Sequence, residues 1–350
     1  MPLDFEAYEQ RLEKIGEALK DTKRLVIMTH DNPDPDSISS ALTLAYIAKA
    51  RFKVPSIVRY GGIVGRAENR AMIRVLKLRA QPLAESDLGK RGTDFAFVDM
   101  QPKTGNSSFR PPKKPVIIID HHSLRKTTRA DYLDIRTEYG ATATILTEYL
   151  LASRLEISSQ LATALSYGIS SETQDLGREA RETDIQAYLA LFPRSNKKLL
   201  ASIEHPKLPR EYFITLNRAM HHSRIYKNAI ATSLGEVANP DFVPFIADFV
   251  LRCERLSWSI CVGRFQNRII VSIRTTNING RAGRFLRQLI GKRGTAGGHG
   301  MIAGGQIVCE SMEHDRCTDV EYELIKSFWK KLGHKDVADT TPLLVTEPIR

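Results

Sequence analysis

The chain has few cysteines and no long apolar run. Its 350 residues include four cysteines, none at CxxC spacing and all in the second half: Cys253, Cys261, Cys309 and Cys317. This pattern is typical of reduced cysteines in a cytosolic protein. No run of 18 or more apolar residues occurs, so we expect no membrane-spanning segment. The first 20 residues also lack the apolar centre of a secretion signal. These absences predict a cytoplasmic protein.

Acidic residues are outnumbered by basic ones. Asp and Glu together number 40 against 51 for Lys and Arg, which leaves a formal net charge of +11. Such an excess favours polyanionic partners, namely nucleic acid, nucleotides or polyphosphate. Many basic proteins are merely soluble, so the charge indicates a class of partner and does not identify one. The length suggests two domains, and the composition is that of an ordinary globular protein.

The first half alternates between strand and helix patterns. We predict helices over 4–20, 37–50, 66–78, 139–153, 158–168 and 179–192, and strands over 24–29, 55–60, 95–99 and 115–119. This alternation predicts an α/β fold with a mainly parallel sheet and helices on both faces. The strands read as continuous apolar runs, as expected when both faces of a sheet are covered.

The second half has a different order of predicted strands and helices. We predict strands over 229–236, 256–265, 268–275 and 305–311, helices over 241–254, 280–292 and 318–332, and a glycine cluster over 297–305. The expected domains are a catalytic domain over 1–193, a helical connector over 194–227, a smaller α/β domain over 228–335 and a C-terminal tail over 336–350. We expect a cleft between the two domains.

Acids and histidines end three widely separated apolar strands. They are His30, Asp34 and Asp36 after the first strand, Asp99 after another, and Asp120, His121 and His122 after a third. In an open α/β sheet the carboxyl ends of neighbouring strands face one crevice, where ligands bind. Carboxylates gathered so closely would not all ionise unless cations lay between them. The pattern therefore predicts a pair of divalent metal ions.

The first motif has the spacing His-x3-Asp-x-Asp over His30, Asp34 and Asp36. Its two prolines disfavour helix in the residues before them, so we expect an extended loop in which both aspartates point the same way. Oxygen ligands with a histidine suit Mn²⁺ or Mg²⁺. Taken alone, such a segment is more often a turn followed by a helix, with Ser37 or Asp36 as the helix cap.

The Asp120-His121-His122 motif follows four apolar residues. Adjacent side chains of an extended chain do not easily bind one ion, so we assign His121 to metal and His122 to the phosphoryl group of a substrate. Asp120 is expected to orient an imidazole by hydrogen bonding. The second pair of adjacent histidines, His221 and His222, follows no strand and is predicted to be solvated surface.

The order of these motifs resembles the DHH phosphoesterase superfamily over nearly the whole chain. The first motif matches His30–Ser40, the second matches Asp99 and the third matches Asp120-His121-His122. The fourth, Gly-Ile-x-Thr-Asp-Thr, reads Gly-Ile-Ser-Ser-Glu-Thr over 168–173. Glu172 thus stands where the family has Asp and reaches one methylene further. Asp175 is a nearby alternative ligand.

The second half resembles the DHHA1 substrate domain that accompanies this family. The family's Gly-Gly-Gly-His-x-x-Ala-Ala-Gly pattern is approximated over 296–305, with Gly297, Gly298 and His299 in the expected places and one residue inserted. Arg274 ends a strand at the position where the family has an arginine that contacts phosphate. Glycines let backbone N–H groups approach an anion closely. A glycine-rich turn without a ligand is the alternative for this cluster alone.

The resemblance implies hydrolysis of phosphoester bonds with two Mn²⁺ ions, with Mg²⁺ or Co²⁺ as alternatives. One ion would be held by His30, Asp34 and Asp99, and the other by Asp36, Asp99, His121 and Glu172, with Asp99 bridging. His122, Arg274 and His299 would neutralise and orient the phosphate.

For the substrate, the resemblance implies a short RNA, a dinucleotide or a nucleoside bisphosphate. Hydrolysis of polyphosphate or pyrophosphate is an alternative, and so is a nucleotide-binding protein with weakened catalysis, which the altered fourth motif motivates. A homodimer is compatible with the sequence, which leaves the oligomeric state open.

Overall fold

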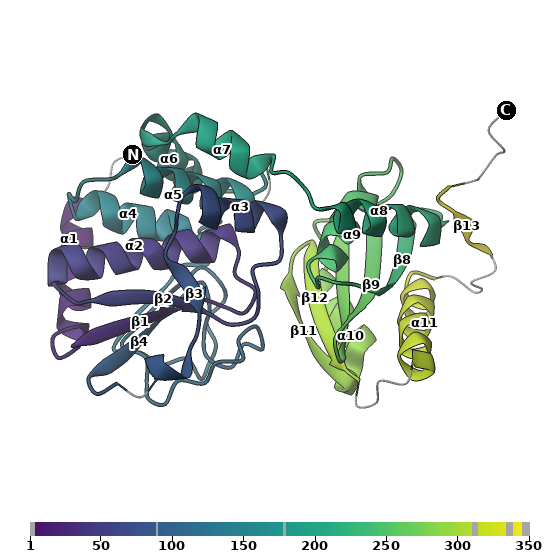
Figure 1. The fold of residues 1–350 in the computed structure, drawn as a ribbon, viewed down its shortest axis with the longest axis horizontal. Coiled ribbons are helices and arrows are strands. Elements are labelled where there is room, and N and C mark those ends of the chain that lie inside the picture. The colour runs from purple at the N-terminus through teal and green to yellow at the C-terminus, as the bar shows by residue number, and fades with distance from the viewer. Residues whose placement is uncertain (1–3, 89, 178–179, 310–313, 334–338, 345–350) are drawn as a thin grey trace. The chain divides into compact units, whose positions relative to one another are not determined.

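The computed structural model describes residues 4–88, 90–177, 180–309, 314–333 and 339–344. The chain forms two compact units, Met1–Pro206 and Lys207–Arg350 (Figure 1). The first unit contains a six-stranded parallel sheet and the second contains a separate seven-stranded sheet, so the predicted α/β class with a mainly parallel sheet is confirmed. The segment predicted as a connector is divided between the units, with one of its helices in each.

The first sheet has the strand order β3-β2-β1-β4-β5-β6, and every adjacent pair is parallel. Its strands are β1 (Arg24–Met28), β2 (Ser56–Tyr60), β3 (Ala80–Pro82), β4 (Thr93–Val98), β5 (Ile117–Asp120) and β6 (Tyr132–Ile135). The sequence pattern predicted four of them. The edge strands β3 and β6 were missed because neither is an apolar run: β3 has three residues and includes a proline, and an aspartate interrupts β6.

The helices of this unit cover one face of the sheet (Figure 1). They are α1 (Phe5–Ala18), α2 (Pro35–Phe52), α3 (Ala67–Val75), α4 (Thr142–Ala152), α5 (Ser159–Glu172), α6 (Glu182–Leu191) and α7 (Lys197–Glu204). All seven contribute buried residues to one apolar cluster with strand residues such as Leu25 and Ile27. The alternate strand residues, among them Val26 and Met28, pack instead against Phe109 from the loop after β4, and no α-helical residue joins that cluster in the described part of the chain.

The prediction of helices on both faces was therefore wrong. Strand order reverses direction at β1, and right-handed crossovers then put the β4–β5 and β5–β6 connections on the face opposite α2. In this chain those two connections are irregular loops, over 99–116 and 121–131. The loops also carry the second and third motifs, so the face without helices is the one that delivers site residues.

The extended loop predicted before α2 is short. Asp34 is the N-cap of α2: its Oδ1 accepts a hydrogen bond from the backbone N–H of Ser37 at 2.9 Å, and its own N–H donates to Ser37 Oγ at 3.1 Å. Pro35 takes the first helical position, where its missing N–H costs nothing. The cap is thus neither Ser37 nor Asp36, and Asp36 lies inside the helix instead of in an extended segment.

The second unit is built on a seven-stranded sheet of order β11-β12-β10-β9-β8-β7-β13, in which only the β8–β9 pair is parallel. Its strands are β7 (Ser223–Tyr226), β8 (Ala229–Glu236), β9 (Trp258–Phe265), β10 (Arg268–Thr275), β11 (Gly294–His299), β12 (Ile302–Val308) and β13 (Thr341–Pro342). Its helices are α8 (Arg210–His222), α9 (Phe242–Leu251), α10 (Ala282–Ile290) and α11 (His314–Lys331).

The glycine cluster is part of this sheet. We predicted a glycine-rich loop followed by a strand at 305, but residues 294–308 form the β11–β12 hairpin. Gly298 has φ +129°, and a Cβ there would lie 2.3 Å from the carbonyl oxygen of Ile302, so only glycine fits. The predicted tail contributes β13, which pairs with β7. The rest of that tail, over 336–338 and 345–350, lies outside the described residues.

Two features of the structure bear on the expectations drawn from the lack of long apolar runs and from the cysteine pattern. Within the described ranges, no helix combines the length and the apolar character needed to cross a membrane. None of the four cysteines takes part in a disulfide among the residues that are described.

Candidate metal centre

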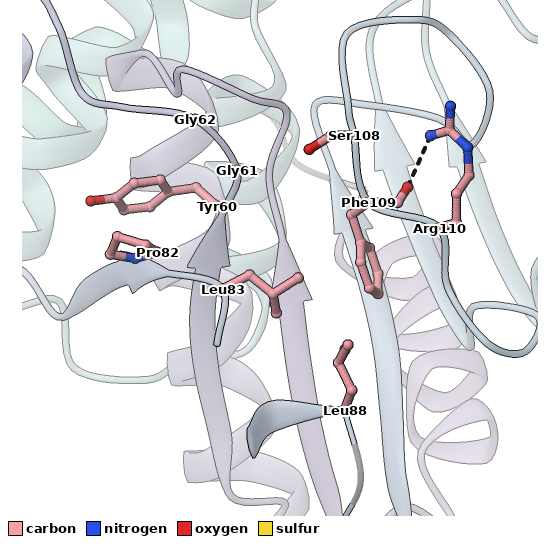
Figure 2. A pocket seen from close by; sticks show the side chains of 9 residues that line it. All are labelled: Tyr60, Gly61, Gly62, Pro82, Leu83, Leu88, Ser108, Phe109 and Arg110. Carbon is pink, nitrogen blue, oxygen red and sulfur yellow. Dashed lines mark hydrogen bonds between the residues drawn. The ribbon is translucent and has the colours of Figure 1, made fainter. Parts of the chain in front are cut away.

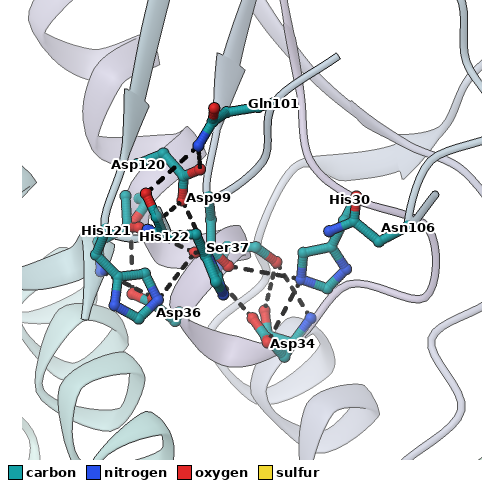
Figure 3. Close-up of polar contacts among 12 residues, drawn as sticks. His30, Asp34, Asp36, Ser37, Asp99, Gln101, Asn106, Asp120, His121 and His122 are labelled. Atoms are coloured by element: carbon teal, nitrogen blue, oxygen red, sulfur yellow. Dashed lines mark hydrogen bonds and ion pairs between the residues drawn. The ribbon is translucent and has the colours of Figure 1, made fainter. Parts of the chain in front are cut away.

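The carboxyl ends of β1, β4 and β5 bring the three motifs together (Figure 3). These strands are neighbours in the sheet, so His30, Asp99 and the Asp120–His122 segment meet although they are spread over about 90 residues of sequence. The first turn of α2 adds Asp34 and Asp36 from the helical side. The site therefore combines strand ends from the sheet with a helix N-terminus.

Asp99 lies at the centre of the site. Its Oδ2 is 3.5 Å from His30 Nε2, and its Oδ1 is 3.5 Å from His121 Nε2. Asp99 adopts φ +57°, an uncommon left-handed conformation for a residue other than glycine, directly after β4. Two groups of side chains place potential ligand atoms within 4.8 Å of one another, His30 with Asp34 and Asp99, and Asp99 with His121 and His122. Asp99 is thus shared by two ligand clusters, one on each of its oxygens.

The two histidines that face Asp99 have one ring nitrogen already engaged. His30 Nδ1 lies 2.9 Å from the carbonyl oxygen of Asp31, and His121 Nδ1 lies 3.2 Å from that of Tyr139. A carbonyl can only accept, so each Nδ1 carries a hydrogen and Nε2 is the atom left for a ligand. His121 Nε2 is buried and has no hydrogen-bond partner among the described residues. A buried imidazole nitrogen without a partner, directed at a carboxylate, fits a bound cation.

The electrostatics of the cluster lead to the same conclusion. Burial alone would lower the pKa of His30, but the carboxylates of Asp34 and Asp99 raise it well above its usual value. Burial, together with the negative charge of Asp34, also raises the pKa of Glu172. Both shifts favour the protonated form of the group, because carboxylates surround it. A divalent cation would take the place of these protons, and a set of nitrogen and oxygen donors without thiolates suits Mn²⁺, Mg²⁺ or Co²⁺.

His122 is held in a different way from His121. Its Nδ1 lies 2.8 Å from Asp120 Oδ1, and its backbone N–H donates to the same oxygen at 3.2 Å. Burial alone would lower the pKa of His122, but the hydrogen bond to Asp120 and the charge of Asp99 raise it to about 9. The side chain is 40% exposed, whereas that of His121 is 8% exposed. The two adjacent histidines therefore differ in environment, as their sequence positions suggested.

Asp36 is fully engaged by the backbone of α4. Its Oδ2 accepts a hydrogen bond from the N–H of Thr142 at 2.9 Å and its Oδ1 from that of Ala143 at 2.6 Å. The hydroxyl of Thr142 donates to Asp99 Oδ1 at 2.9 Å. Burial and the nearby charges of Asp99 and Asp34 raise the pKa of Asp36 well above its usual value. Asp36 belongs to neither ligand cluster, so its predicted role as a ligand stays a prediction.

The fourth motif lies at the end of α5, which continues through Glu172 and does not end at 168 as predicted. A Cβ on Gly168 would lie 2.4 Å from Ser39 Oγ, so this glycine permits close packing of α5 on α2. The charge of Glu172 contributes to the raised pKa of Asp36 and of His122. Asp175 is exposed, and its charge contributes instead to the raised pKa of Tyr188 and of Glu204. Of the two alternatives, Glu172 is the one near the cluster.

The predicted residues of the second unit lie in its own sheet. Arg274 is buried at the end of β10 and pairs with Asp248, Nε to Oδ1, at 2.6 Å. Gly297 and Gly298 belong to β11, and the side chain of His299 lies outside the described part of the chain. His221 and His222 are exposed at the end of α8, in agreement with their interpretation as surface.

A cavity of about 560 Å³ lies near the carboxyl ends of β2 and β3 (Figure 2). Its lining is partly apolar, with Leu83, Leu88 and Phe109, and partly polar, with Ser108 and Arg110. The Ser108 backbone N–H donates to Asp31 Oδ2 at 2.7 Å. The residue that follows His30 therefore fixes one wall of the cavity.

Three residues of the site were not singled out from the sequence. Gln101 bonds to Asp120, Thr142 bonds to Asp99, and the carbonyl of Tyr139 bonds to His121. Gln101 follows the second motif by two residues, and this proximity was the one available signal. Thr142 and Tyr139 lie about 20 residues beyond the third motif, and only the packing of α4 brings them to it.

Part of the chain is similar in sequence to a known protein family. The model of the DHH family, N-terminal domain, matches residues 24–169, which include β1 through most of α5. An uncharacterized protein of Methanocaldococcus jannaschii is 38% identical over 300 residues, 85% of this chain and 60% of that protein. A manganese-dependent inorganic pyrophosphatase of the same organism is 30% identical over 172 residues, 47% of this chain and 52% of that enzyme.

A crystal structure shows the same fold over most of the chain. It is that of an exopolyphosphatase-related protein from Bacteroides fragilis, with a TM-score of 0.69, 15% identity, and coverage of 93% of this chain and 97% of that one. The present chain spans 60% of the length of the uncharacterized relative and about half that of the pyrophosphatases. The part of the chain that matches the model of the DHH family, N-terminal domain, is thus residues 24–169.

Proposed function

We propose that this chain is a phosphoesterase that depends on two divalent cations, with Mn²⁺ as the first candidate. The observation that carries the proposal is the position of Asp99, whose two oxygens face two separate clusters of ligand atoms. His30 and Asp34 would complete one metal site, and His121 the other. Asp36 and Glu172 are the nearest further carboxylates for the second ion. The matching manganese-dependent pyrophosphatases support the choice of metal.

Two bound cations would supply Lewis acidity to the phosphoryl oxygens and lower the pKa of a coordinated water. The chain's own residues would do the rest. His122, whose pKa is raised to about 9, would direct a positive charge at a phosphoryl oxygen, while Asp120 keeps the ring in place through Nδ1. Asp99 would be a ligand shared by both cations, and its Oδ1 also accepts a hydrogen bond from the Thr142 hydroxyl.

For the substrate we propose a short RNA, a dinucleotide or a nucleoside bisphosphate. Residues 100–130 contain seven basic residues and one acidic residue, Asp120, which is buried. This segment forms the loops next to the metal centre, so it would attract a polyanion. The cavity beside Asp31 offers Leu83 and Phe109, which suit an organic group such as a base and not an inorganic phosphate chain. Arg274, Gly297, Gly298 and His299 would bind substrate phosphate in the second unit.

Hydrolysis of pyrophosphate or polyphosphate is the second candidate. It is favoured by the 30% identity to a pyrophosphatase, which is confined to 172 residues. A protein that binds nucleotides with little turnover is the third, and the glutamate at position 172 motivates it. Its carboxylate reaches one methylene further than the aspartate of the family pattern.

A substrate panel tests the proposal directly. The metal-stripped protein would be supplied with Mn²⁺ and offered a short RNA, a linear dinucleotide, a nucleoside 3′,5′-bisphosphate, pyrophosphate and polyphosphate. We expect turnover of a nucleotide substrate, its loss in Asp99→Asn, and unchanged turnover in His221→Ala, which alters an exposed histidine far along the chain. Preferential turnover of pyrophosphate would establish the second candidate. Binding of nucleotides without product from any substrate would establish the third.

A further inference from the structure

We infer that Gln101 is a positioning residue that holds the loop after the Asp-His-His motif in place and thereby fixes where His122 points. Gln101 follows Asp99 by two residues and is completely buried. The hydrogen bonds of its amide reach no ligand atom of the two clusters, and Gln101 acts through Asp120 and the loop over 122–128. The inference rests on the proposed function and assigns a task to a residue outside the metal and phosphate ligands.

Both ends of the Gln101 amide are engaged, and Figure 3 shows the contact of its nitrogen with Asp120. Its Nε2 donates to Asp120 Oδ2 at 2.8 Å and lies 3.3 and 3.4 Å from the carbonyl oxygens of Ser123 and His122. Its Oε1 accepts from the backbone N–H of Arg125 at 2.9 Å and from the hydroxyl of Thr128 at 2.8 Å. Turning the amide over would set its NH₂ against an N–H donor and its oxygen against a carboxylate, so only one orientation is satisfied.

The contact with Asp120 passes directly to His122. Because Gln101 occupies Oδ2, the remaining oxygen of Asp120 is the one that accepts from His122 Nδ1 at 2.8 Å. The carboxylate cannot rotate without breaking a buried hydrogen bond on one side or the other, and a buried polar group left without a partner is destabilising. The ring of His122 is thus held by a chain of two hydrogen bonds that begins at Gln101.

Further hydrogen bonds of the loop are local: the Thr128 N–H donates to the carbonyl of Arg125 at 3.0 Å, and Arg129 Nη1 donates to that of Lys126 at 2.9 Å. Residues 123–127 are exposed, and Leu124 is 56% exposed. Thr128 is buried, and its hydroxyl bonds to Gln101. A shorter Asn would not reach both sides, a Glu would keep the acceptor and lose the donor, and a Met would lose both. Glutamine is the side chain that joins the loop to Asp120.

Three variants separate these contacts. Gln101→Met removes both the donor to Asp120 and the acceptor for the loop. Gln101→Glu keeps an acceptor for Arg125 and Thr128 but places a carboxylate against that of Asp120. Thr128→Val removes only the hydrogen bond from the Thr128 hydroxyl. Thr127→Val, on the exposed neighbouring residue, is the matched control. Circular dichroism and thermal melting would establish that each variant is folded.

The first readout is kinetic. For the substrate found in the panel, we expect kcat to fall about tenfold to a hundredfold in Gln101→Met and Gln101→Glu, with KM changed much less. Thr128→Val should lower kcat by a smaller factor, and Thr127→Val should have the same kcat as the parent. An unchanged kcat in Gln101→Met would overturn the inference.

The second readout needs no metal and no turnover. In the metal-free protein, amide hydrogen exchange of Arg125 should accelerate in Gln101→Met and stay slow in Gln101→Glu, and the Nδ1–H resonance of the His122 ring should be lost or broadened in both. Unchanged exchange and an unchanged His122 resonance in Gln101→Met would also overturn the inference. If the parent hydrolyses nothing but the Arg125 and His122 signals respond, the proposed function fails while the structural role of Gln101 stands.

Discussion

Asp36 Oδ2 accepts a hydrogen bond from the backbone N–H of Thr142 across 2.9 Å, and so joins the first turn of α2 to the first turn of α4. The N-cap of α4, Ala141, has no side chain to satisfy the free N–H groups of that helix, and the Asp36 carboxylate satisfies two of them. The bond also brings the hydroxyl of Thr142 to Asp99. A carboxylate expected as a metal ligand thus has a structural task in the metal-free protein.

Replacing Asp36 tests whether its hydrogen bonds to α4 or its repulsion with Asp99 has the larger effect on stability. In metal-free protein, Asp36→Ala leaves two buried N–H groups without acceptors, which we expect to lower the free energy of unfolding by about 2 kcal/mol. Loss of repulsion with Asp99 acts in the opposite direction. Urea denaturation measures the difference, with Asp175→Ala as a control at an exposed carboxylate. An increase in stability would show that repulsion outweighs the bonds to α4.

Cation binding should stabilise the first unit. Addition of Mn²⁺ to the metal-stripped protein at about 100 times its dissociation constant should add about 2.7 kcal/mol, seen as a rise in Tm. His121→Ala removes the buried Nε2 that has no partner among the described residues, so it should weaken metal binding and reduce this rise. His221→Ala should respond like the parent. Equal rises in His121→Ala and the parent would exclude His121 as a ligand.

Asp87 should make stability depend on pH in the acid range. Hydrogen bonds from Arg59, and then from Arg24, outweigh the effect of burial and lower the pKa of Asp87 from 3.8 to about 2. Because the folded-state pKa is depressed, this stabilisation is present in full above pH 3.8 and is lost as the pH falls through 2. It amounts to about 2 kcal/mol.

The corresponding measurement compares the parent with Asp87→Asn by denaturant unfolding from pH 6 to pH 2. The stability difference between them should be constant in the upper part of this range and shrink below pH 3.8. A difference that does not change with pH would show that the charge of Asp87 contributes nothing.

The basic loop that begins within the third motif, residues 121–130, should strengthen the binding of long substrates. Lys126 is exposed and carries no acidic neighbour in the segment 121–130. We expect Lys126→Ala to raise KM for a short RNA several-fold at low salt, to leave kcat unchanged and to have less effect at high salt. Steady-state kinetics at two salt concentrations measure this, with pyrophosphate as the comparison substrate. The same increase in KM for pyrophosphate would contradict a role in binding beyond the scissile phosphate.

The sequence by itself determined the local features of this protein. Apolar runs that end in His30, Asp99 and Asp120 identified strands and their polar ends, because a strand pattern and the residue after it are properties of a few consecutive residues. The same holds for the resemblance of the motifs to the DHH family, and for the interpretation of His221 and His222 as surface.

Tertiary structure decided everything that depends on which segments meet. The strand order placed both irregular crossovers on one face, and the packing of α4 gave Asp36 its backbone partners and Asp99 its hydroxyl. The glycine cluster forms a hairpin whose second strand, β12, also pairs with β10, about 30 residues earlier. Gln101 bonds to Asp120 and Thr128, which are also distant in the sequence. Such contacts are non-local hydrogen bonds, and the residues that form them carry no trace of their partner in the local sequence.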